Sequence, residues 1–439
     1  MSRHVCVVGA GWSGLACALA LQQHGSDVTL IDAAPRPGGR ARRVDVALGD
    51  ASYPLDNGQH LLVGAYRETL KVIARVGLDP ARMLLRVPFG LRYPDGFALA
   101  ARRLPAPWHL ATALLAAGRF TFADRISLAR DVHQWKRDGW LLARDVPARE
   151  VLRFATPGAL RRVWNPLCLA ALNAPLDQAS GQILLNVLKD SIGTGAAASD
   201  MLVPRCDLSA LFPDAALRAL RDGGARVILR AAATALITRP GARWSLALRD
   251  RTLDADAVVL ALPPERAAAL LESSALAELS PAVAQLRRIE SAPIATVYLR
   301  YVPPLRLAAP LYALHDDPGR GRFGQWVFDR GVLDPARAGV LAVVISGSGP
   351  HLGVERDGLC KAVADQLSED LALPPPLAHR VIVEKRATIL PRPGLLRPAV
   401  SLPAPGLFLA GDAADSGYPS TIEGSVRAGI AAAHAAISA

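Results

Sequence analysis

The residues from 4 to 32 carry the pattern that most constrains the fold. A short apolar run leads into the glycines Gly9, Gly11 and Gly14, an apolar helical segment follows, and a second apolar run ends in Asp32. This order of strand, glycine turn, helix, strand and acid predicts a dinucleotide-binding βαβ unit, in which the terminal carboxylate accepts from a ribose hydroxyl. The expected fold class is therefore α/β, with a Rossmann-type parallel sheet.

Each glycine has a physical task in such a unit. Gly9 permits the tight turn, Gly11 lets the backbone approach a pyrophosphate, and Gly14 allows the helix to pack closely on the strand. The first turn of the helix, with Trp12 and Ser13, offers unpaired N–H groups and a positive dipole end to phosphates. On these residues alone, the nucleotide could belong to NAD or to FAD.

Composition excludes several other classes of protein. A chain that is 51% hydrophobic can bury enough apolar surface to fold, so a disordered polymer is excluded. No uninterrupted apolar stretch reaches the roughly 20 residues that a membrane-spanning helix needs. The five cysteines show no metal-ligand spacing, so no metal site is predicted. The first residues lack a signal-peptide pattern, and a cytoplasmic location is expected.

The formal net charge of +11 is carried almost wholly by arginine. A basic protein can bind nucleic acid or an anionic membrane surface. The arginines are scattered and no nucleic-acid motif appears, so no nucleic-acid partner is expected. The apolar segment 104–120 contains Trp108 and is flanked by Arg102, Arg103 and Arg119. It is too short to span a bilayer, but it could lie in a membrane interface or form an ordinary core helix.

A run of two glycines and two arginines follows the second predicted strand. Gly38, Gly39, Arg40 and Arg42 suit a loop that wraps a diphosphate and places a guanidinium on it. The run resembles the GGRxR segment of the flavin amine oxidase and carotenoid desaturase superfamily. This resemblance implies that the cofactor is FAD.

The C-terminal segment strengthens the resemblance to this superfamily. An apolar run ends in Gly411 and Asp412, and a helix start capped by Ser420 or Thr421 follows. The resemblance implies that Asp412 contacts FAD and that the helix N-terminus, with Thr421 and Ile422, points at the flavin ring. Many members attach FAD to a cysteine in this region. This chain has none there, so FAD is expected to bind non-covalently.

A third cofactor segment is expected in the middle of the chain. Alternating strands around a turn at Pro240-Gly241 precede a buried strand that returns to the cofactor. The resemblance places an adenine contact near Ala233 and a backbone contact at Leu262.

The resemblance implies an interleaved architecture, in which an FAD-binding domain alternates with an α+β substrate domain. The FAD-binding segments are 1–70, 205–265 and 395–439, and the substrate segments are 71–204 and 266–394. Segment 71–204 is expected to be mainly helical, and segment 266–394 is expected to contain a sheet at 290–350.

Four further segments narrow the resemblance. They are Leu55-Asp-Asn-Gly-Gln-His60-Leu-Leu-Val-Gly-Ala-Tyr66, Val163-Trp-Asn-Pro-Leu-Cys-Leu-Ala-Ala-Leu-Asn173-Ala-Pro, Ser199-Asp-Met-Leu-Val-Pro-Arg205-Cys-Asp-Leu-Ser209 and Gln325-Trp-Val-Phe-Asp-Arg330. Together they look like the bacterial hydroxysqualene dehydroxylase family of hopanoid biosynthesis. The resemblance implies that reduced FAD removes the allylic hydroxyl of a C30 isoprenoid, giving squalene. No second nucleotide motif appears, so the reductant of the flavin is an unidentified partner.

The same resemblance assigns roles to individual residues. Gly58, Gln59 and His60 would lie against the flavin ring. The walls of the substrate pocket would include Trp164, Asn165, Trp326 and Tyr418.

The reaction also needs a proton donor for the leaving hydroxyl. His60 is the first candidate, because an imidazole can protonate a hydroxyl near neutral pH, although it could instead only orient the cofactor. Asp56 and Glu423 are the alternatives.

Two other activities stay open. An oxidative polyprenoid desaturase would use the same pocket with opposite electron flow. A flavin amine oxidase commonly needs a lysine near the flavin, and only Lys189 or Lys385 could serve.

Overall fold

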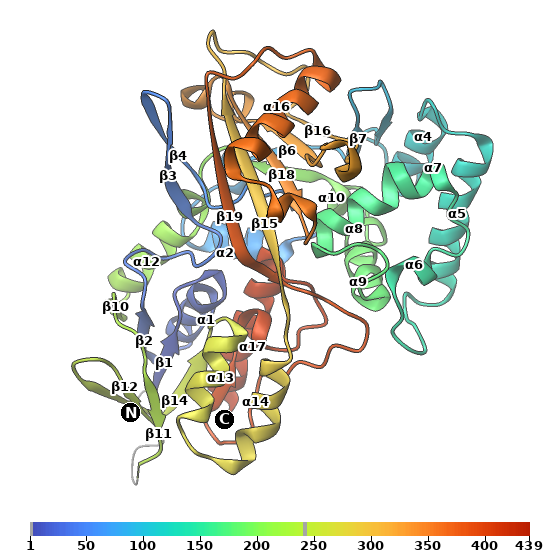
Figure 1. The fold of residues 1–439 in the computed structure, drawn as a ribbon. Helices are drawn as coiled ribbons and strands as arrows, with labels where there is room; N and C mark the ends of the chain where they lie inside the picture. Colours follow the sequence, from blue (N-terminus) through green and yellow to red (C-terminus); the bar gives the residue numbers. More distant parts are fainter. Residues whose placement is uncertain (1–2, 240–243) are drawn as a thin grey trace.

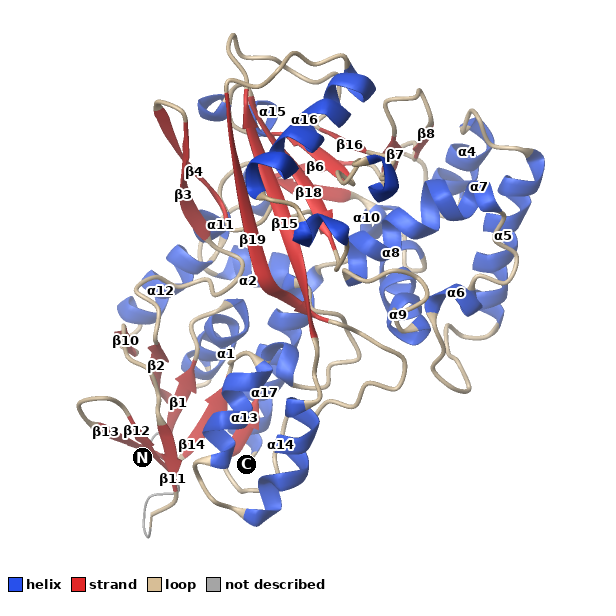
Figure 2. Cartoon of the chain, viewed as in Figure 1, coloured by secondary structure: helices blue, strands red, loops and turns tan. Residues whose placement is uncertain are grey.

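The computed structural model describes residues 3–239 and 244–439. A parallel sheet with its helices forms one end of the molecule, a long antiparallel sheet forms the other, and a helical lobe lies beside the antiparallel sheet (Figures 1 and 2). The turn expected at Pro240-Gly241 lies outside the described residues. The strands on either side of it belong to a small antiparallel sheet of β11 (Ala235–Ile237), β12 (Trp244–Ala247) and β13 (Thr252–Ala255).

The parallel sheet has the strand order β10-β2-β1-β14-β20. Its strands come from widely separated parts of the chain: β1 (His4–Val8), β2 (Asp27–Asp32), β10 (Arg226–Leu229), β14 (Ala257–Leu260) and β20 (Leu407–Leu409). The central strands are continuous apolar runs because helices cover both faces of the sheet. The expected α/β class is confirmed.

Two helices pack tightly against each other beside this sheet. α1 (Trp12–Gln23) is buried over most of its length and contacts α17 (Ile422–Ser438), the last helix of the chain. The other helices around the sheet are α2 (Arg67–Arg75), α11 (Leu208–Leu211), α12 (Pro213–Asp222), α13 (Pro264–Glu272) and α14 (Ser280–Arg287). Because α17 closes onto α1, the two ends of the chain build one layer.

The antiparallel sheet has the order β16-β17-β18-β15-β19. Its strands are β15 (Ser291–Arg300), β16 (Leu311–Ala313), β17 (Trp326–Asp329), β18 (Val340–Ser346) and β19 (Ala378–Ile389). Successive residues of β18 belong alternately to two hydrophobic cores, because side chains of a strand point to opposite faces. α16 (Arg356–Leu371) covers one face, and the helical lobe covers the other. The sheet expected at 290–350 therefore forms, with β19 as an additional strand.

The segment 71–204 is helical only in part. Its helices are α3 (Pro80–Met83), α4 (Trp108–Ala116), α5 (Phe122–Arg137), α6 (Ala148–Val151), α7 (Pro157–Ala159), α8 (Asn165–Leu172), α9 (Gly181–Ile192) and α10 (Ala196–Ser199), with the π-helical turn η1 (Leu160–Trp164). Its strands are β6 (Leu84–Val87), β7 (Gly90–Arg92), β8 (Ala98–Ala100) and β9 (Met201–Pro204). β9 pairs with β6 and with β5 (Leu62–Val63), so this segment is tied to the first seventy residues.

The first seventy residues also reach the antiparallel sheet. The hairpin of β3 (Arg43–Leu48) and β4 (Ala51–Asp56) contacts β19. The domain boundaries stay a prediction, since the segments interlock at β5 and at this hairpin. Within residues 3–239 and 244–439, no helix combines the length and the apolar character needed to cross a membrane.

Candidate active site

A cleft lies where the carboxyl ends of β1 and β2 meet the loops that follow them, the usual ligand position in an open α/β sheet. We call it the nucleotide cleft. Most of the residues predicted to bind the cofactor line it: Gly9, Gly11, Trp12, Ser13, Asp32, Gly38, Gly39, Arg40, His60, Ala233, Leu262, Gly411, Asp412, Thr421 and Ile422. Segments that are distant in the sequence thus converge on one cleft.

The glycine turn between β1 and α1 is shaped by close backbone contacts. Gly9 has φ +111°, and a Cβ there would lie 2.2 Å from the carbonyl oxygen of Ala261. Gly14 does not line the cleft but lies behind it, where a Cβ would be 1.8 Å from the carbonyl oxygen of Gly9. These two glycines let α1 begin directly at the edge of the sheet, with its N-terminus at the cleft.

The start of α1 fits an anionic group such as a diphosphate. Among the described residues, no side chain caps this N-terminus, so its first N–H groups remain open to a ligand. Gly11 bridges to Gly38, and a Cβ on Gly39 would be 3.2 Å from the Cα of Gly11, so the two loops approach at backbone distance. The buried hydroxyl of Ser13 lines the cleft without a hydrogen-bond partner in the described structure.

Two hydrogen bonds from backbone N–H groups hold the carboxylate of Asp32 at the end of β2. The carboxylate accepts from the backbone N–H of Ala10 at 2.5 Å and from that of Ala34 at 2.7 Å. These bonds orient the carboxylate at the cleft wall and leave acceptor capacity for further donors. The position suits recognition of a ribose hydroxyl.

An ion pair joins two of the loops that line the cleft. The guanidinium of Arg40 donates to the carboxylate of Asp412, and it also donates to the carbonyl oxygen of Ala387 at 3.0 Å. Burial alone would lower the pKa of Arg40, but the charge and hydrogen bond of Asp412 raise it above its ordinary value. Arg40 therefore stays cationic in the cleft, as a group that neutralises a diphosphate must.

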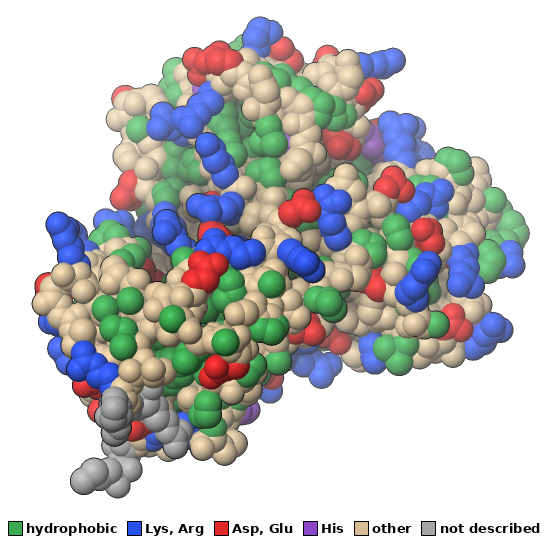
Figure 3. Space-filling model, turned by 60° about the horizontal axis from the view of Figure 1, so that its bottom comes forward, with side chains coloured by type: hydrophobic (Ala, Val, Ile, Leu, Met, Phe, Trp, Pro, Cys, Tyr) green, Lys and Arg blue, Asp and Glu red, His purple; other side chains and the backbone are tan. Residues whose placement is uncertain are grey.

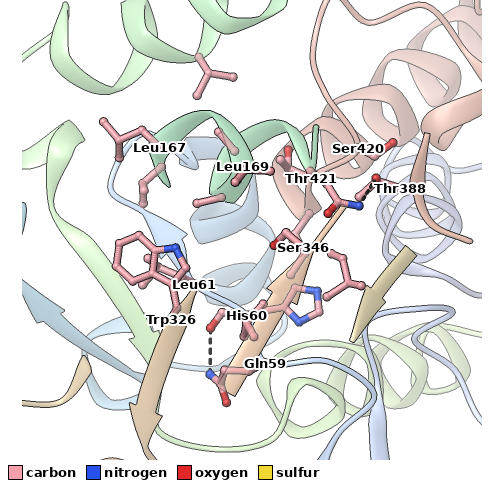
Figure 4. A pocket seen from close by; sticks show the side chains of 18 of the residues that line it. Gln59, His60, Leu61, Leu167, Leu169, Trp326, Ser346, Thr388, Ser420 and Thr421 are labelled. Atoms are coloured by element: carbon pink, nitrogen blue, oxygen red, sulfur yellow. Dashed lines mark hydrogen bonds between the residues drawn. The ribbon is translucent and has the colours of Figure 1, made fainter. Parts of the chain in front are cut away.

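A second cavity lies between the antiparallel sheet and helices α8 and α9 (Figure 4). We call it the apolar cavity. Its charged lining residues are Arg40 and Glu384. Its aliphatic and aromatic lining residues include Leu61, Val63, Phe89, Leu91, Leu167, Leu169, Leu184, Val187, Leu188, Ile192, Met201, Ile294, Trp326, Phe328 and Val344. Such a wall suits a hydrocarbon.

The two cavities share one wall, which we call the junction. It consists of Arg40, His60, Ala387, Ser420, Thr421 and Ile422. The N-terminus of α17 begins here, where Thr421 accepts from the backbone N–H of Gly424 at 3.0 Å. A cofactor held in the nucleotide cleft would present its reacting end to the apolar cavity at the junction.

His60 faces both cavities, but its protonation differs from what a proton donor needs. Its Nδ1 lies 2.6 Å from the carbonyl oxygen of Gly58, which can only accept, so Nδ1 carries the hydrogen. Burial lowers the pKa of His60, so the ring is neutral near pH 7 and Nε2 presents a lone pair. Its neighbours Gly58 and Gln59 line the apolar cavity, and the side-chain amide of Gln59 donates to the carbonyl oxygen of His60 (Figure 4).

The two alternative proton donors, Asp56 and Glu423, line neither cavity. Asp56 is buried and accepts from the backbone N–H of Leu208 at 2.7 Å, and burial raises its pKa to about 6. Glu423 is fully buried and accepts from the N–H and hydroxyl of Thr69 and from Arg427. Its bonds join α17 to α2, so Glu423 holds the helix N-terminus and does not face a substrate.

Three of the four predicted pocket walls also lie elsewhere. The ring of Trp164 packs against Trp135 at a centroid distance of 5.2 Å inside the helical lobe, because η1 points it there. Asn165 is exposed at the start of α8. The ring of Tyr418 packs under Arg427. Trp326 does line the apolar cavity, and its buried indole Nε1 has no partner within the described residues.

Several polar residues of the apolar cavity were given no role by sequence reasoning, and Tyr66 and Glu384 are two of them. Tyr66 is buried at the cavity wall, near the junction, and burial raises the pKa of its phenol to about 12, against a hydrogen bond from Thr421 that lowers it. Glu384 of β19 accepts from the side chain of Asn57 at 2.9 Å. The signal for Tyr66 was its place six positions after His60 in the same segment, which the resemblance predicts to face the flavin.

Comparison with known proteins agrees with this geometry. A hydroxysqualene dehydroxylase of Sinorhizobium fredii is 28% identical and one of Rhodopseudomonas palustris is 29% identical, each over 100% of this chain and 99% of its own length. An oxidoreductase from Methanosarcina mazei shares the fold, with a TM-score of 0.74, 15% identity and coverage of 98% of this chain and 99% of that one. The family described as flavin containing amine oxidoreductase matches residues 12–437. The chain therefore belongs to the flavin containing amine oxidoreductase family, as a flavin-dependent oxidoreductase.

Proposed function

We propose that this protein removes the hydroxyl group of hydroxysqualene and yields squalene, with FAD as a non-covalently bound cofactor. The observation that carries the proposal is the junction, where the nucleotide cleft opens onto a cavity walled by aliphatic and aromatic side chains. A C30 isoprenoid needs such a wall, because each buried methylene contributes about 0.8 kcal/mol to binding. The names of the two dehydroxylase relatives favour this substrate.

The reaction breaks one C–O bond and forms one C–H bond at the same allylic carbon. The oxygen leaves as water after it accepts a proton, and reduced FAD, when bound, supplies the two electrons. An unidentified partner protein or small molecule reduces the flavin again before the next turnover. The apolar cavity excludes water from the reacting carbon, which protects an allylic cation from capture by solvent.

The nucleotide cleft supports FAD in preference to a shorter flavin. Besides Thr421 at the junction and Arg40, its lining includes Asp32 and Ala233, the residues expected to contact a ribose and an adenine. Within the described chain, no cysteine lines either cavity, which supports non-covalent binding.

We propose Tyr66 as the proton donor, in place of His60. A phenol with a pKa of about 12 keeps its proton throughout the physiological range. The neutral ring of His60 would instead offer Nε2 as an acceptor, which suits positioning of the substrate hydroxyl or of the cofactor. The two assignments differ in pH profile. Donation by His60 requires its cationic form, so turnover would rise as the pH falls through the lowered pKa of His60, whereas donation by Tyr66 predicts a flat profile there.

The substrate also supports a membrane location, because C30 hydrocarbons partition into bilayers. We therefore propose that the protein works as a peripheral protein on the inner face of the cytoplasmic membrane.

An oxidative polyprenoid desaturase is the second candidate, since the same apolar cavity would hold its substrate. The amine oxidase alternative is weaker. Lys189 and Lys385 are both exposed, and neither lines either cavity.

The deciding experiment incubates the purified flavoprotein with hydroxysqualene and a chemical reductant without oxygen, followed by mass analysis of the product. The proposal expects squalene, which has lost one oxygen and kept its number of double bonds. A product with an additional double bond, formed only with an electron acceptor present, would establish the desaturase. Hydrogen peroxide released from amines in air would establish the amine oxidase.

A further inference from the structure

An exposed apolar corner stands at the end of the helical lobe. We define it by five side chains of α4, α5 and the residues before α4: Leu104 is 37% exposed, Trp108 64%, Leu115 73%, Phe122 75% and Ile126 40%. Large apolar side chains that are exposed singly are normal on protein surfaces, but a group gathered on two adjacent helices indicates an interaction site.

The corner is held in one rigid geometry. Trp108 and Leu115 are seven positions apart and share one face of α4, and Phe122 and Ile126 are four positions apart on one face of α5. The guanidinium of Arg125 in α5 donates to the carbonyl oxygens of Leu114 and Ala117 at 3.1 and 2.8 Å. This cap joins the end of α4 to α5, so Leu115 and Phe122 flank one fixed turn.

The corner lies on a chain segment whose exposed charges are cationic up to the end of α5, where the exposed acid Asp138 follows. Every exposed Asp, Glu, Lys or Arg side chain between residues 96 and 137 is cationic: Arg102, Arg103, Arg119, Arg130, Lys136 and Arg137. The two acids of this segment, Asp124 and Asp131, are buried, where Asp124 accepts from Thr121 and Asp131 accepts from the backbone N–H of Phe154. Lys and Arg side chains stand beside hydrophobic ones on the lobe that α4 and α5 form (Figure 3).

We propose that the apolar corner docks on the surface of an anionic phospholipid bilayer. Phe122, Leu115 and Trp108 would enter the boundary between headgroups and acyl chains, and the arginines would contact the lipid phosphates. A second copy of this chain fits less well, because a two-fold dimer would bring two cationic faces together. The proposal specifies a face for the membrane location proposed above and in that respect rests on the proposed function, whereas binding to vesicles can be measured without any substrate.

The corner is connected to the apolar cavity through packed helices. α5 contacts α7, α7 contacts η1, and η1 continues into α8, which lines the cavity. Docking at the corner would therefore bring the helical roof of the cavity close to the bilayer from which a C30 hydrocarbon must come.

The tryptophans provide a direct test, because only one of the seven is exposed. The other six, at positions 12, 135, 140, 164, 244 and 326, are at most 7% exposed. Trp108 emission should therefore shift to shorter wavelength when the protein meets vesicles of phosphatidylcholine and phosphatidylglycerol, and acyl-brominated lipids should quench it. The Trp108→Phe variant should bind the same vesicles without this spectral change. Binding of the wild type without any change in Trp108 emission would overturn the proposal.

Vesicle co-sedimentation separates the two contributions to docking. The variant Leu115→Gln/Phe122→Gln should lose roughly tenfold or more in affinity, since two side chains no longer bury in the interface. The variant Arg102→Ala/Arg103→Ala should lose affinity only for the anionic vesicles, by roughly fivefold per arginine, and high salt should mimic it. Leu396→Gln is the matched control, since Leu396 is 69% exposed and lies outside the corner.

Equal losses of affinity in the control and in the corner variant would contradict the proposal. So would a failure of the wild type to bind vesicles either with or without the anionic lipid. A concentration-dependent dimer abolished by Leu115→Gln/Phe122→Gln would replace the bilayer by a second copy as occupant.

Discussion

The nucleotide cleft and the apolar cavity meet at the junction, but they are built from different parts of the chain's chemistry. The cleft is shaped by backbone, by glycines such as Gly9 and Gly39, and by polar groups held in fixed bonds. The cavity is shaped by apolar side chains from β7, β17, β18, α8 and α9, which no single motif connects. The cleft should therefore be sensitive to a single added methyl group, whereas the cavity should be sensitive to added polarity.

The largest effect is expected at the wall of the cavity. Tyr66→Phe keeps the ring but removes the phenolic proton, so turnover should fall by about 10²-fold or more, the usual contribution of a general acid. Flavin content and the affinity for squalene should stay unchanged, which separates cavity chemistry from the cleft. The measurement is single-turnover oxidation of the reduced flavin by hydroxysqualene. Full activity in Tyr66→Phe, together with a wild-type rate that rises in acid, would return the proton donor to His60.

The second prediction concerns a substitution that should distort the nucleotide cleft and leave the apolar cavity unchanged. Gly14→Ala places a Cβ 1.8 Å from the carbonyl oxygen of Gly9, so α1 must move away from β1. Such overpacking costs about 1–3 kcal/mol, and we expect loss of bound flavin after desalting and a lower melting temperature. Gly353→Ala is the matched control, because nothing lies within 4 Å of a Cβ there. Flavin retention at the wild-type level in Gly14→Ala would contradict the role of this close contact.

A third prediction concerns stability on the cavity side of the molecule. Burial raises the pKa of Asp131 in α5 to about 6, above its value in the unfolded chain. The folded state therefore binds more protons between about pH 4 and pH 6, and its stability falls as the pH rises through this window. Relative to the wild type, Asp131→Asn should gain about 2 kcal/mol of unfolding free energy between pH 4 and pH 7. Denaturant unfolding across this range measures it, and parallel curves for the two proteins would refute the assignment.

The smallest effect is expected when one polar group is added to the wall of the apolar cavity. Val344→Thr in β18 introduces a hydroxyl into the cavity wall at nearly constant volume, and we expect affinity for squalene to fall by roughly fivefold. Val343→Thr is the matched control, because its side chain points to the opposite face, into the core under α16. The control should lower stability without changing squalene affinity. Equal affinity losses in both variants would show that the effect is global.

The cleft could be predicted from sequence because its signals are local. Gly9, Gly11 and Asp32 act on backbone geometry within one βαβ unit, so their spacing alone indicates the turn, the helix start and the strand end. The fold class was predictable for the same reason. Asp412 and Thr421 are distant in sequence, and their arrival at the cleft was expected from a family resemblance and not from spacing.

The cavity was less predictable because its walls form only through tertiary packing. Trp164 and Trp326 are equally apolar in sequence, but η1 turns Trp164 into the helical lobe while β17 turns Trp326 into the cavity. Asp56 and Glu423 are titratable residues in or next to segments predicted to face the flavin, yet the carboxylate of each accepts hydrogen bonds from another element. Which neighbour faces the cavity depends on strand register and helix rotation. The missed strand β19 brought Glu384 to the same wall.

In the proposed reaction, electrons pass across the junction to a substrate in the apolar cavity. The most direct measurement reduces the flavoprotein without oxygen, adds hydroxysqualene and follows the flavin absorbance in a single turnover. We expect the oxidised flavin spectrum to return and one squalene to form for each flavin. A flavin that stays reduced in the presence of bound hydroxysqualene would contradict the proposed reaction.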